Sequence, residues 1–297
     1  MASAELQTVL DMLKAVPVLQ GNTVHEMRAS MEAMTAKTPP PEAASWEPTD
    51  AAGVPAEWVT ADEAAASDRA IVYLHGGGYC LGSLNSHRNL AANLSRAATA
   101  RVLNVDYRLA PEHPHPAAID DAVAAYDYAL DQGLAPEKLA IGGDSAGGGL
   151  TVATLVALRN AGKPLPAAGI CISPWVDLTL SGESMQTKAG LDPIVTEASL
   201  RMMADAYAPG PAAKSPGASP LFDDLEGLPP LLVHVGSAEV LLDDARSLVE
   251  RAEKAGVDVE FDVWEDLFHV WHAFAGLLPE AQQAIDKIGA YLDRRWN

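Results

Sequence analysis

The sequence predicts an α/β fold in which a mostly parallel sheet carries helices on both faces. Short apolar runs rich in β-branched residues recur between residues 70 and 265, and segments with helical spacing separate them. Strands that alternate with helices of about 10 to 15 residues are typical of parallel sheets. A chain of 297 residues with 48% hydrophobic content is long enough for one large core, so we expect one main domain.

The expected strands are compact, and several end in glycines or polar residues. The run "AIVYL" leads into "HGGG", and "KLAIGG" leads into "DSAGGG". A short run that is apolar throughout is typical of a strand buried on both faces. The six expected strands cover residues 70–74, 101–107, 138–143, 167–173, 229–236 and 257–265.

Four segments between and after these runs show helical spacing. In "AAIDDAVAAYDYAL", the side chains of Ile119, Val123, Tyr126 and Leu130 fall on one face of a helix. Another segment begins in the glycines of "AGGGL" and continues as an apolar helix. The expected helices cover residues 117–130, 146–160, 241–256 and 279–296.

Two segments depart from this alternation. The N-terminal part is rich in helix-forming residues and passes into the proline- and alanine-rich stretch 35–55, which we interpret as a connector leading into short strands. Residues 178–226 have the pattern of helices inserted between two strands, and the insertion is too long for an ordinary connection. We therefore expect a lid formed by this insertion.

The composition excludes several classes of partner. A net charge of −20 and a pI near 4.6 argue against nucleic acid and anionic membrane surfaces, which would repel this protein. No apolar run approaches the roughly 18 residues of a membrane helix, and Glu5 and Asp11 lie where a secretory signal would be basic or apolar. Two cysteines far apart, Cys80 and Cys171, fit a reducing cytoplasm better than a disulfide framework. No metal site is predicted.

A candidate nucleophile lies at the end of the third expected strand. Residues 143–147, "GDSAG", fit the pattern G-x-S-x-G, which places a serine on a sharp turn between a strand and a helix. The flanking glycines leave room for that turn. Because the apolar "KLAIG" precedes the pattern and a helical segment follows it, we interpret Ser145 as a reactive side chain.

The segment "HGGGY", residues 75–79, ends the first expected strand. Acyl transfer passes through a tetrahedral oxyanion, which backbone N–H groups stabilise when they point at it in advance. We assign Gly77 and Gly78 as such donors, together with the N–H of Ala146, the residue after the nucleophile. The spacing fits neither of the common phosphate-binding glycine loops. We expect His75 to shape this loop through side-chain hydrogen bonds.

A carboxylate and a histidine follow the last two expected strands. A serine hydroxyl needs a histidine to take its proton and a carboxylate to orient the imidazole. Glu239 follows "LLVHVGSA", and His269 follows "VDVEFDVWEDLF". The order nucleophile, acid, histidine is the one expected for an α/β-hydrolase. His272 lies three residues further on and is an alternative base.

Three motifs in this order resemble the hormone-sensitive-lipase-like family of bacterial carboxylesterases. They are "HGGGY" at 75–79, "YRLAPEHPHPAAIDD" at 107–121 and "GDSAGG" at 143–148, and the likeness extends from about Ala70 to the C-terminus. The resemblance implies an α/β-hydrolase fold with an N-terminal helical cap, here residues 1–45, on a catalytic domain of residues 46–297. It also implies hydrolysis of short acyl esters without a cofactor, with Ser145 as nucleophile and His269 as base.

The acid departs from the family's usual motif. Where the family often has Asp-Pro-Leu-x-Asp, this chain has Glu239, Val240, Leu241, Leu242 and Asp243. Glu239 matches the acid, and Asp243 matches the second carboxylate of the motif. A glutamate can orient an imidazole if the backbone sits back by roughly one methylene. We favour Glu239 and keep Asp243 as the alternative.

Other interpretations of the same residues remain open. A lactonase or an N-acetyl or amide hydrolase would use the same three side chains, and plant gibberellin receptors, which look similar to this family, bind a small molecule without catalysis. In the "YRLAPEHPHP" loop we expect Arg108 and Glu112 to pair beneath the site. The resemblance makes a homodimer through the strand at 257–265 plausible, although an edge strand can be protected in other ways. The expected partner is a small-molecule ester.

Overall fold

A mixed sheet forms the centre of the protein. The computed structural model describes residues 3–16, 18–19 and 21–297, so four positions of the predicted N-terminal segment lie outside the described residues. The eight described strands follow the order β1-β2-β4-β3-β5-β6-β7-β8, and all pairs from β4 to β8 are parallel. The predicted α/β architecture is therefore confirmed. The strands are β1 (Ala44–Ala51), β2 (Val54–Ala61), β3 (Ala70–Leu74), β4 (Arg101–Val105), β5 (Leu139–Asp144), β6 (Ala168–Ile172), β7 (Leu231–Gly236) and β8 (Val259–Trp264).

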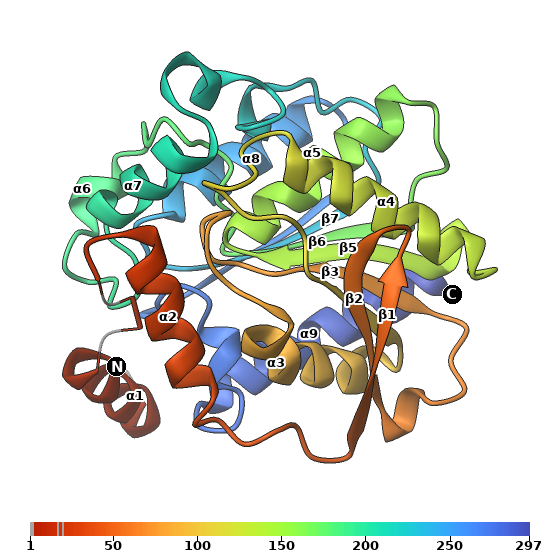
Figure 1. Ribbon diagram of the computed structural model, residues 1–297, viewed down its shortest axis with the longest axis horizontal. Helices are drawn as coiled ribbons and strands as arrows, with labels where there is room; N and C mark the ends of the chain where they lie inside the picture. The colour runs from red at the N-terminus through yellow and green to blue at the C-terminus, as the bar shows by residue number, and fades with distance from the viewer. Residues whose placement is uncertain (1–2, 17, 20) are drawn as a thin grey trace.

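Helices cover both faces of the sheet (Figure 1). Helices α3 and α9 pack on one face, and α4, α5 and α8 pack on the other. Strands β3, β5, β6 and β7 are consequently buried along their whole length, which explains their uniformly apolar sequences. Helix α3 was not predicted from the sequence. The helices are α1 (Ala4–Ala15), α2 (Val24–Thr35), α3 (Leu84–Ala98), α4 (Ala117–Asp131), α5 (Ala146–Asn160), α6 (Ser184–Thr187), α7 (Glu197–Tyr207), α8 (Leu242–Lys254) and α9 (Pro279–Trp296).

The stretch 35–55, interpreted as a connector, contains most of a β-hairpin. Strands β1 and β2 pair antiparallel along their full length, and Gly53, with φ +91°, lies in the turn between them. Strand β1 is an edge strand, so the missing N–H of Pro48 interrupts no ladder with a further strand. Strand β2 then pairs with β4 and joins the hairpin to the main sheet.

Two helical segments lie over the loops that follow the parallel strands. Helix α1 packs Leu6, Val9 and Leu13 into a cluster with Phe268 and Trp271. Helix α2 buries Val24 and Met27 in the main core. Between β6 and β7 the chain forms α6, α7 and the short 3-10 helices η3 (Gly210–Lys214) and η4 (Pro220–Phe222). We call the segment with α1 and α2 the N-terminal cap, and the segment between β6 and β7, with α6, α7, η3 and η4, the cap insertion.

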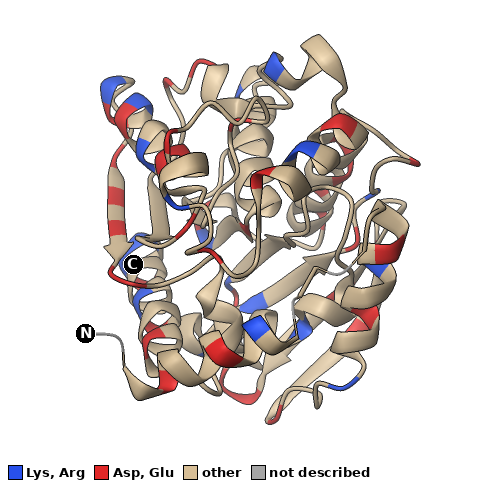
Figure 2. Ribbon diagram, turned by 90° about the vertical axis from the view of Figure 1, so that its left-hand side faces the viewer, with Lys and Arg blue, Asp and Glu red and all other residues tan. Residues whose placement is uncertain are grey.

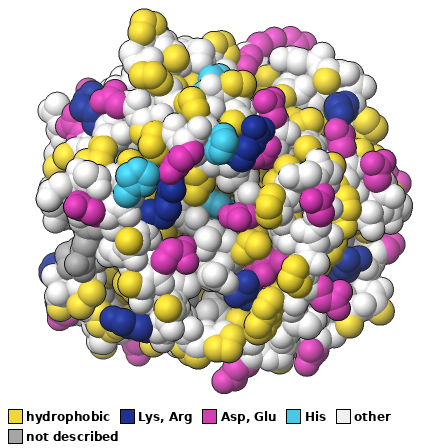
Figure 3. Space-filling view, viewed as in Figure 1, with side chains coloured by type: hydrophobic (Ala, Val, Ile, Leu, Met, Phe, Trp, Pro, Cys, Tyr) yellow, Lys and Arg dark blue, Asp and Glu magenta, His cyan; other side chains and the backbone are white. Residues whose placement is uncertain are grey.

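Acidic residues occur along many of the elements (Figure 2), and on the face shown in Figure 3 their side chains are scattered rather than gathered in one patch. Many of the few basic side chains pair with them, as Arg294 does with Glu260 and Arg295 with Asp258. Within the described ranges, no helix is both long and apolar enough to cross a bilayer. Strand β8 ends the sheet, so a dimer formed through it stays a prediction.

Candidate active site

Ser145 lies on the turn between β5 and α5. Its backbone has φ 55° and ψ −120°, a conformation that L-residues rarely adopt. The turn is held by the Ser145 N–H, which donates to the carbonyl of Ile172 at 2.8 Å, and by its carbonyl, which accepts from Trp175 at 2.9 Å. Gly147 approaches the carbonyl of Leu74 so closely that no Cβ fits there. The predicted G-x-S-x-G turn is therefore present. Hydrogen bonds to the end of β6 and to the loop after it stabilise the unfavourable backbone conformation of Ser145.

A buried row of hydrogen bonds joins the three predicted triad residues. His269 Nε2 lies 2.9 Å from Ser145 Oγ, and His269 Nδ1 lies 3.0 Å from Glu239 Oε2. Ser145 is 6% exposed, His269 3% and Glu239 0%. Because Nδ1 faces a carboxylate, its proton is held there, and Nε2 presents a lone pair to the serine hydroxyl.

The second carboxylate oxygen of Glu239 has two donors of its own. Ser173 Oγ and the N–H of Gly236 each donate to Oε1 at 2.7 Å. Ser173 Oγ also accepts from the N–H of Val270, the residue after His269. Sequence reasoning missed Ser173, although its position directly after strand β6 was a signal, since side chains at the carboxyl ends of parallel strands gather at one edge.

The alternatives for acid and base lie elsewhere. Asp243 Oδ2 accepts from the N–H of Ser184 at 2.8 Å, and Oδ1 lies 3.5 Å from Arg246. His272 Nε2 lies 3.1 Å from Nδ1 of His234 on β7, inside the protein. Within the described residues, neither Asp243 nor His272 forms a hydrogen bond with Ser145 or His269.

Charges around the imidazole favour its protonated form. Burial lowers the pKa of His269, but the hydrogen bond and negative charge of Glu239 outweigh burial, so the pKa lies above its ordinary value of 6.5. Asp192 of the cap insertion adds to this effect. Its side chain accepts from the N–H groups of Ile194 and Val195 and, at 3.2 Å, from that of Val240, and burial raises its pKa to about 6.

The three expected oxyanion donors lie in the loop after β3 and at the start of α5. Gly77 and Gly78 have φ +115° and +61°, and Ala146 begins helix α5. Within the described part of the chain, the N–H groups of these three residues donate no hydrogen bond to another residue. They are thus available to a ligand, and the α5 N-terminus adds the positive end of its dipole.

The buried carboxylate of Asp144, next to Ser145, ties the end of β5 to the loop after β3. Asp144 Oδ1 accepts from the hydroxyl of Tyr73 at 2.6 Å and from the N–H of Gly76 at 3.0 Å. Burial raises the pKa of Asp144, but the charge and hydrogen bond of His87, with Nε2 3.5 Å from Oδ2, outweigh it and hold the pKa at about 2. His75 Nδ1 lies 2.7 Å from the carbonyl of Gly76, so His75 does shape the loop through its side chain.

The expected pair of Arg108 and Glu112 is wrong. Arg108 Nη2 lies 2.7 Å from Asp121 in α4, and Glu112 instead receives two hydrogen bonds from Arg28 of α2, at 3.0 and 3.1 Å. The prediction used nearness in sequence, whereas the loop's turns direct Arg108 toward α4 and Glu112 toward the N-terminal cap.

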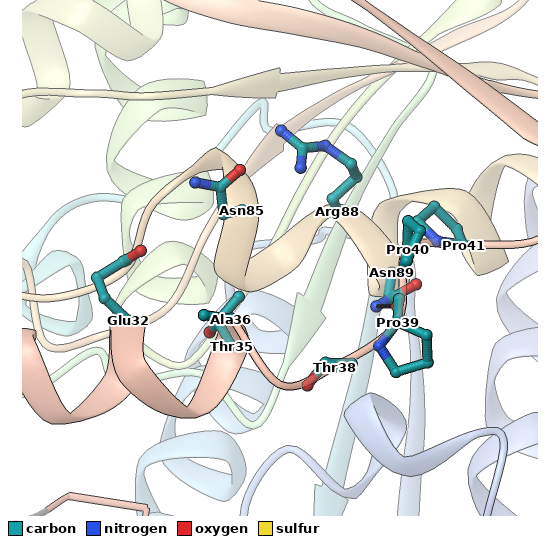
Figure 4. Close-up of a pocket in the computed structure, with 10 residues that line it drawn as sticks. All are labelled: Glu32, Thr35, Ala36, Thr38, Pro39, Pro40, Pro41, Asn85, Arg88 and Asn89. Atoms are coloured by element: carbon teal, nitrogen blue, oxygen red, sulfur yellow. Dashed lines mark hydrogen bonds between the residues drawn. The ribbon is translucent and has the colours of Figure 1, made fainter.

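A surface pocket of about 220 Å³ lies between the end of α2 and the start of α3 (Figure 4). Its lining contains none of the triad or oxyanion-loop residues. The guanidinium of Arg88 is bound to Glu57 at 2.7 Å, so the pocket's main cation already has a partner. We assign no role to this pocket.

The fold and the site define an α/β hydrolase with a serine, a histidine and a carboxylate in line. Residues 71–273 match the family described as alpha/beta hydrolase fold. The chain is 52% identical to an acetyl-hydrolase of Streptomyces hygroscopicus, over 80% of this chain and 79% of that protein. It is 39% identical to an esterase of Acinetobacter venetianus, over 82% and 80% of the two chains.

Solved structures agree with these relatives. The crystal structure of an esterase from the bacterial hormone-sensitive lipase family superposes with a TM-score of 0.96 at 48% identity, over 100% of both chains. An esterase/lipase from an uncultured bacterium gives a TM-score of 0.94 at 46% identity, over 99% of both chains. The chain belongs to the hormone-sensitive-lipase-like family of bacterial carboxylesterases and is a carboxylic ester hydrolase.

Proposed function

We propose that this enzyme is a serine carboxylesterase that hydrolyses short-chain acyl esters through Ser145, His269 and Glu239. The observation that carries the proposal is the unbroken row from Ser145 Oγ to His269 and on to Glu239, with separations of 2.9 and 3.0 Å. This is the arrangement that converts a weakly acidic hydroxyl into a nucleophile.

The reaction then follows from the geometry. Ser145 Oγ attacks the ester carbonyl carbon while its proton passes to His269 Nε2. The tetrahedral oxyanion forms, the bond to the alcohol breaks, and His269 returns the proton to the departing alcohol. Water deprotonated by His269 attacks the acyl-enzyme, and collapse of the second oxyanion releases the acid and restores Ser145.

The oxyanion of both steps faces the N–H groups of Gly77, Gly78 and Ala146. Such donors are already oriented, so they stabilise the charge that develops without reorganising, and a single donor contributes on the order of 3 kcal/mol. Glu239 keeps the imidazole oriented and stabilises its positive charge while the proton is held.

The preference for short acyl groups rests on the space above the oxyanion loop. The side chain of Met203, from α7, is packed against Gly78, so that a Cβ there would overlap the sulfur. Met203 is 1% exposed, and we infer that it limits the length of the acyl chain. The relative named an acetyl-hydrolase supports an acyl group of the smallest size.

A panel of p-nitrophenyl esters from acetate to laurate tests this proposal. We expect kcat/KM to be greatest for the short members, roughly acetyl to hexanoyl, and Ser145→Ala to lose at least about a thousandfold of the activity. Undiminished hydrolysis by Ser145→Ala would refute the nucleophile, and a preference for laurate would refute the short-chain assignment. Lactones and N-acetylated amines in the same panel separate the ester from the alternative bonds.

A further inference from the structure

The oxyanion loop has a backbone that needs outside support. Three consecutive residues, Gly77, Gly78 and Tyr79, have positive φ values, of +115°, +61° and +62°. Tyr79 is not a glycine, so this conformation is unfavourable by on the order of 1 kcal/mol. Such conformations persist only where the surroundings hold them.

Within residues 77–81, one turn supports the backbone. The N–H groups of Cys80 and Leu81 both donate to the carbonyl of Gly77, at 3.0 and 2.8 Å. The carbonyl of Tyr79 accepts from the N–H of Ala110 at 2.9 Å, which ties the loop to the segment after β4. The start of the loop is also held by Asp144, which accepts from the N–H of Gly76, and around Tyr79 and Cys80 the two caps add further contacts.

The N-terminal cap contributes the side chain of Arg28, from α2. Arg28 Nε donates to the carbonyl of Cys80 at 3.0 Å, and Nη2 donates to the carbonyl of Ala110 at 3.0 Å. One planar guanidinium thus bridges the two backbone segments that Ala110 and Tyr79 already join. Nη1 and Nη2 of the same guanidinium also donate to the carboxylate of Glu112.

The cap insertion contributes an aromatic ring that stacks on Tyr79. Tyr207, at the end of α7, stacks on Tyr79 with ring centroids 3.9 Å apart and planes within 3°. Tyr79 and Tyr207 are each 1% exposed. Residue 79, with its unfavourable φ, is therefore held through its side chain by one cap and through its neighbour's carbonyl by the other.

The charge pair with Glu112 does not explain the placement of Arg28. The Glu112 side chain is 43% exposed, and an exposed ion pair contributes little to stability. The two inward hydrogen bonds go to carbonyl groups, for which a fixed fork of donors is suited and a lysine ammonium is not. The inward bonds fix the spacing between the oxyanion loop and the loop after β4.

We propose that Arg28 is a positioning residue that holds the oxyanion loop in its donor-presenting conformation when the N-terminal cap is seated. The inference rests on the proposed serine esterase mechanism. Arg28 does not touch the substrate; it acts through the carbonyl of Cys80, two residues after Gly78. A cap that moves away takes the guanidinium with it, so cap seating and transition-state stabilisation change together.

The test compares Arg28→Ala and Arg28→Lys with Arg159→Lys as a matched control. Arg159 also donates to two backbone carbonyls, those of Asp224 and Glu226, at a site away from the oxyanion loop. For p-nitrophenyl butyrate we expect Arg28→Ala to lower kcat about 10- to 30-fold with KM changed less than about threefold. Displacing the loop should lower kcat by less than the roughly hundredfold decrease expected when a donor is removed altogether. Arg28→Lys should lower kcat less than Arg28→Ala does, and Arg159→Lys should leave kcat unchanged.

Two further readouts separate positioning from simple loss of folding. Added guanidinium ion at millimolar concentration should restore part of the kcat of Arg28→Ala and none of Ser145→Ala. The inhibition constant of an alkyl trifluoromethyl ketone, which forms a tetrahedral oxyanion with the serine, should rise in proportion to the loss of kcat/KM. Thermal unfolding of each variant measures the folded fraction.

The outcomes distinguish this inference from the proposed function. If wild-type enzyme hydrolyses the ester and Ser145→Ala does not, while folded Arg28→Ala keeps wild-type kcat, the mechanism stands and the role of Arg28 is overturned. A loss confined to KM, or a loss without rescue and without weaker ketone binding, overturns it as well. Wild-type enzyme without serine-dependent hydrolysis overturns the proposed function itself.

Discussion

Replacing Glu239 by glutamine tests the orientation of the imidazole. Glutamine has nearly the same shape as glutamate but presents one oxygen and one NH2 group. The oxygen will occupy the place of Oε1, because the N–H of Gly236 can only donate and lies 2.7 Å away. The NH2 group then faces His269 Nδ1, which must accept instead of donate.

This reversal removes the base. With Nδ1 as the acceptor, the proton of the neutral imidazole moves to Nε2, which faces the hydroxyl of Ser145 at 2.9 Å. A histidine held in the wrong tautomer lowers kcat by about 10³ to 10⁴ in a serine hydrolase. At 1.36 kcal/mol for each tenfold change, the barrier rises by about 4 to 5.5 kcal/mol.

Asp243→Asn is the matched control, because Asp243 is the competing acid of the sequence motif. Its carboxylate binds the N–H of Ser184 and lies near Arg246, so we expect less than about a threefold change in kcat. Both variants are assayed with p-nitrophenyl butyrate, and thermal unfolding confirms that each is folded. A folded Glu239→Gln that keeps more than a tenth of wild-type kcat, or an Asp243→Asn that loses as much, would refute the assignment.

Three further predictions concern packing and pH. A Cβ at position 147 would lie 1.8 Å from the carbonyl oxygen of Leu74, so Gly147→Ala should lower the free energy of unfolding by about 3 kcal/mol or more. Gly276 has open space around it, so the control Gly276→Ala should change the free energy of unfolding by less than about 0.5 kcal/mol. Urea titration measures both values. In the proposed mechanism neutral His269 is the base, and its pKa is raised, so kcat/KM should decrease as the pH falls below a pKa that lies above 6.5. Asp192→Asn removes a negative charge near His269 and should therefore shift this pKa in the kcat/KM profile to lower pH. Burial lowers the pKa of His75 to about 3. As the pH falls from 6.5 toward 3, the unfolded chain therefore binds a proton at His75 that the folded chain does not bind, and the folded state loses stability. In this pH range, His75→Gln should reduce the pH dependence of the unfolding free energy by about 1.4 kcal/mol per pH unit.

The features predicted correctly from the sequence are local ones. The strand, turn and helix around Ser145 follow from a few neighbouring residues, because an apolar run, a pair of glycines and a helical segment each constrain the backbone directly. The positions of Glu239 and His269 follow from topology, since both lie just beyond the carboxyl ends of neighbouring strands, β7 and β8.

The features that were missed depend on contacts between distant segments. Arg28 and Glu112 are 84 residues apart, and no pattern around either one specifies the other. Ser173 could be placed near the site by its strand, but the direction of its hydroxyl depends on the Glu239 carboxylate and on the N–H of Val270 in the loop after β8. The hairpin β1–β2 was obscured by prolines, which an edge strand tolerates.

The glutamate at position 239 shows how topology and side-chain length compensate each other. Its extra methylene would leave an unsupported carboxylate free to rotate away from the imidazole. Here Oε1 is fixed by the hydroxyl of Ser173 and the N–H of Gly236, so Oε2 is left with one orientation, toward His269. A Cβ on Gly236 would lie 2.1 Å from the carbonyl of Leu267 and 3.1 Å from Oε1, which explains why that strand ends in glycine. The orientation of the Glu239 carboxylate is thus defined by the two donors behind it as much as by its own position in the motif.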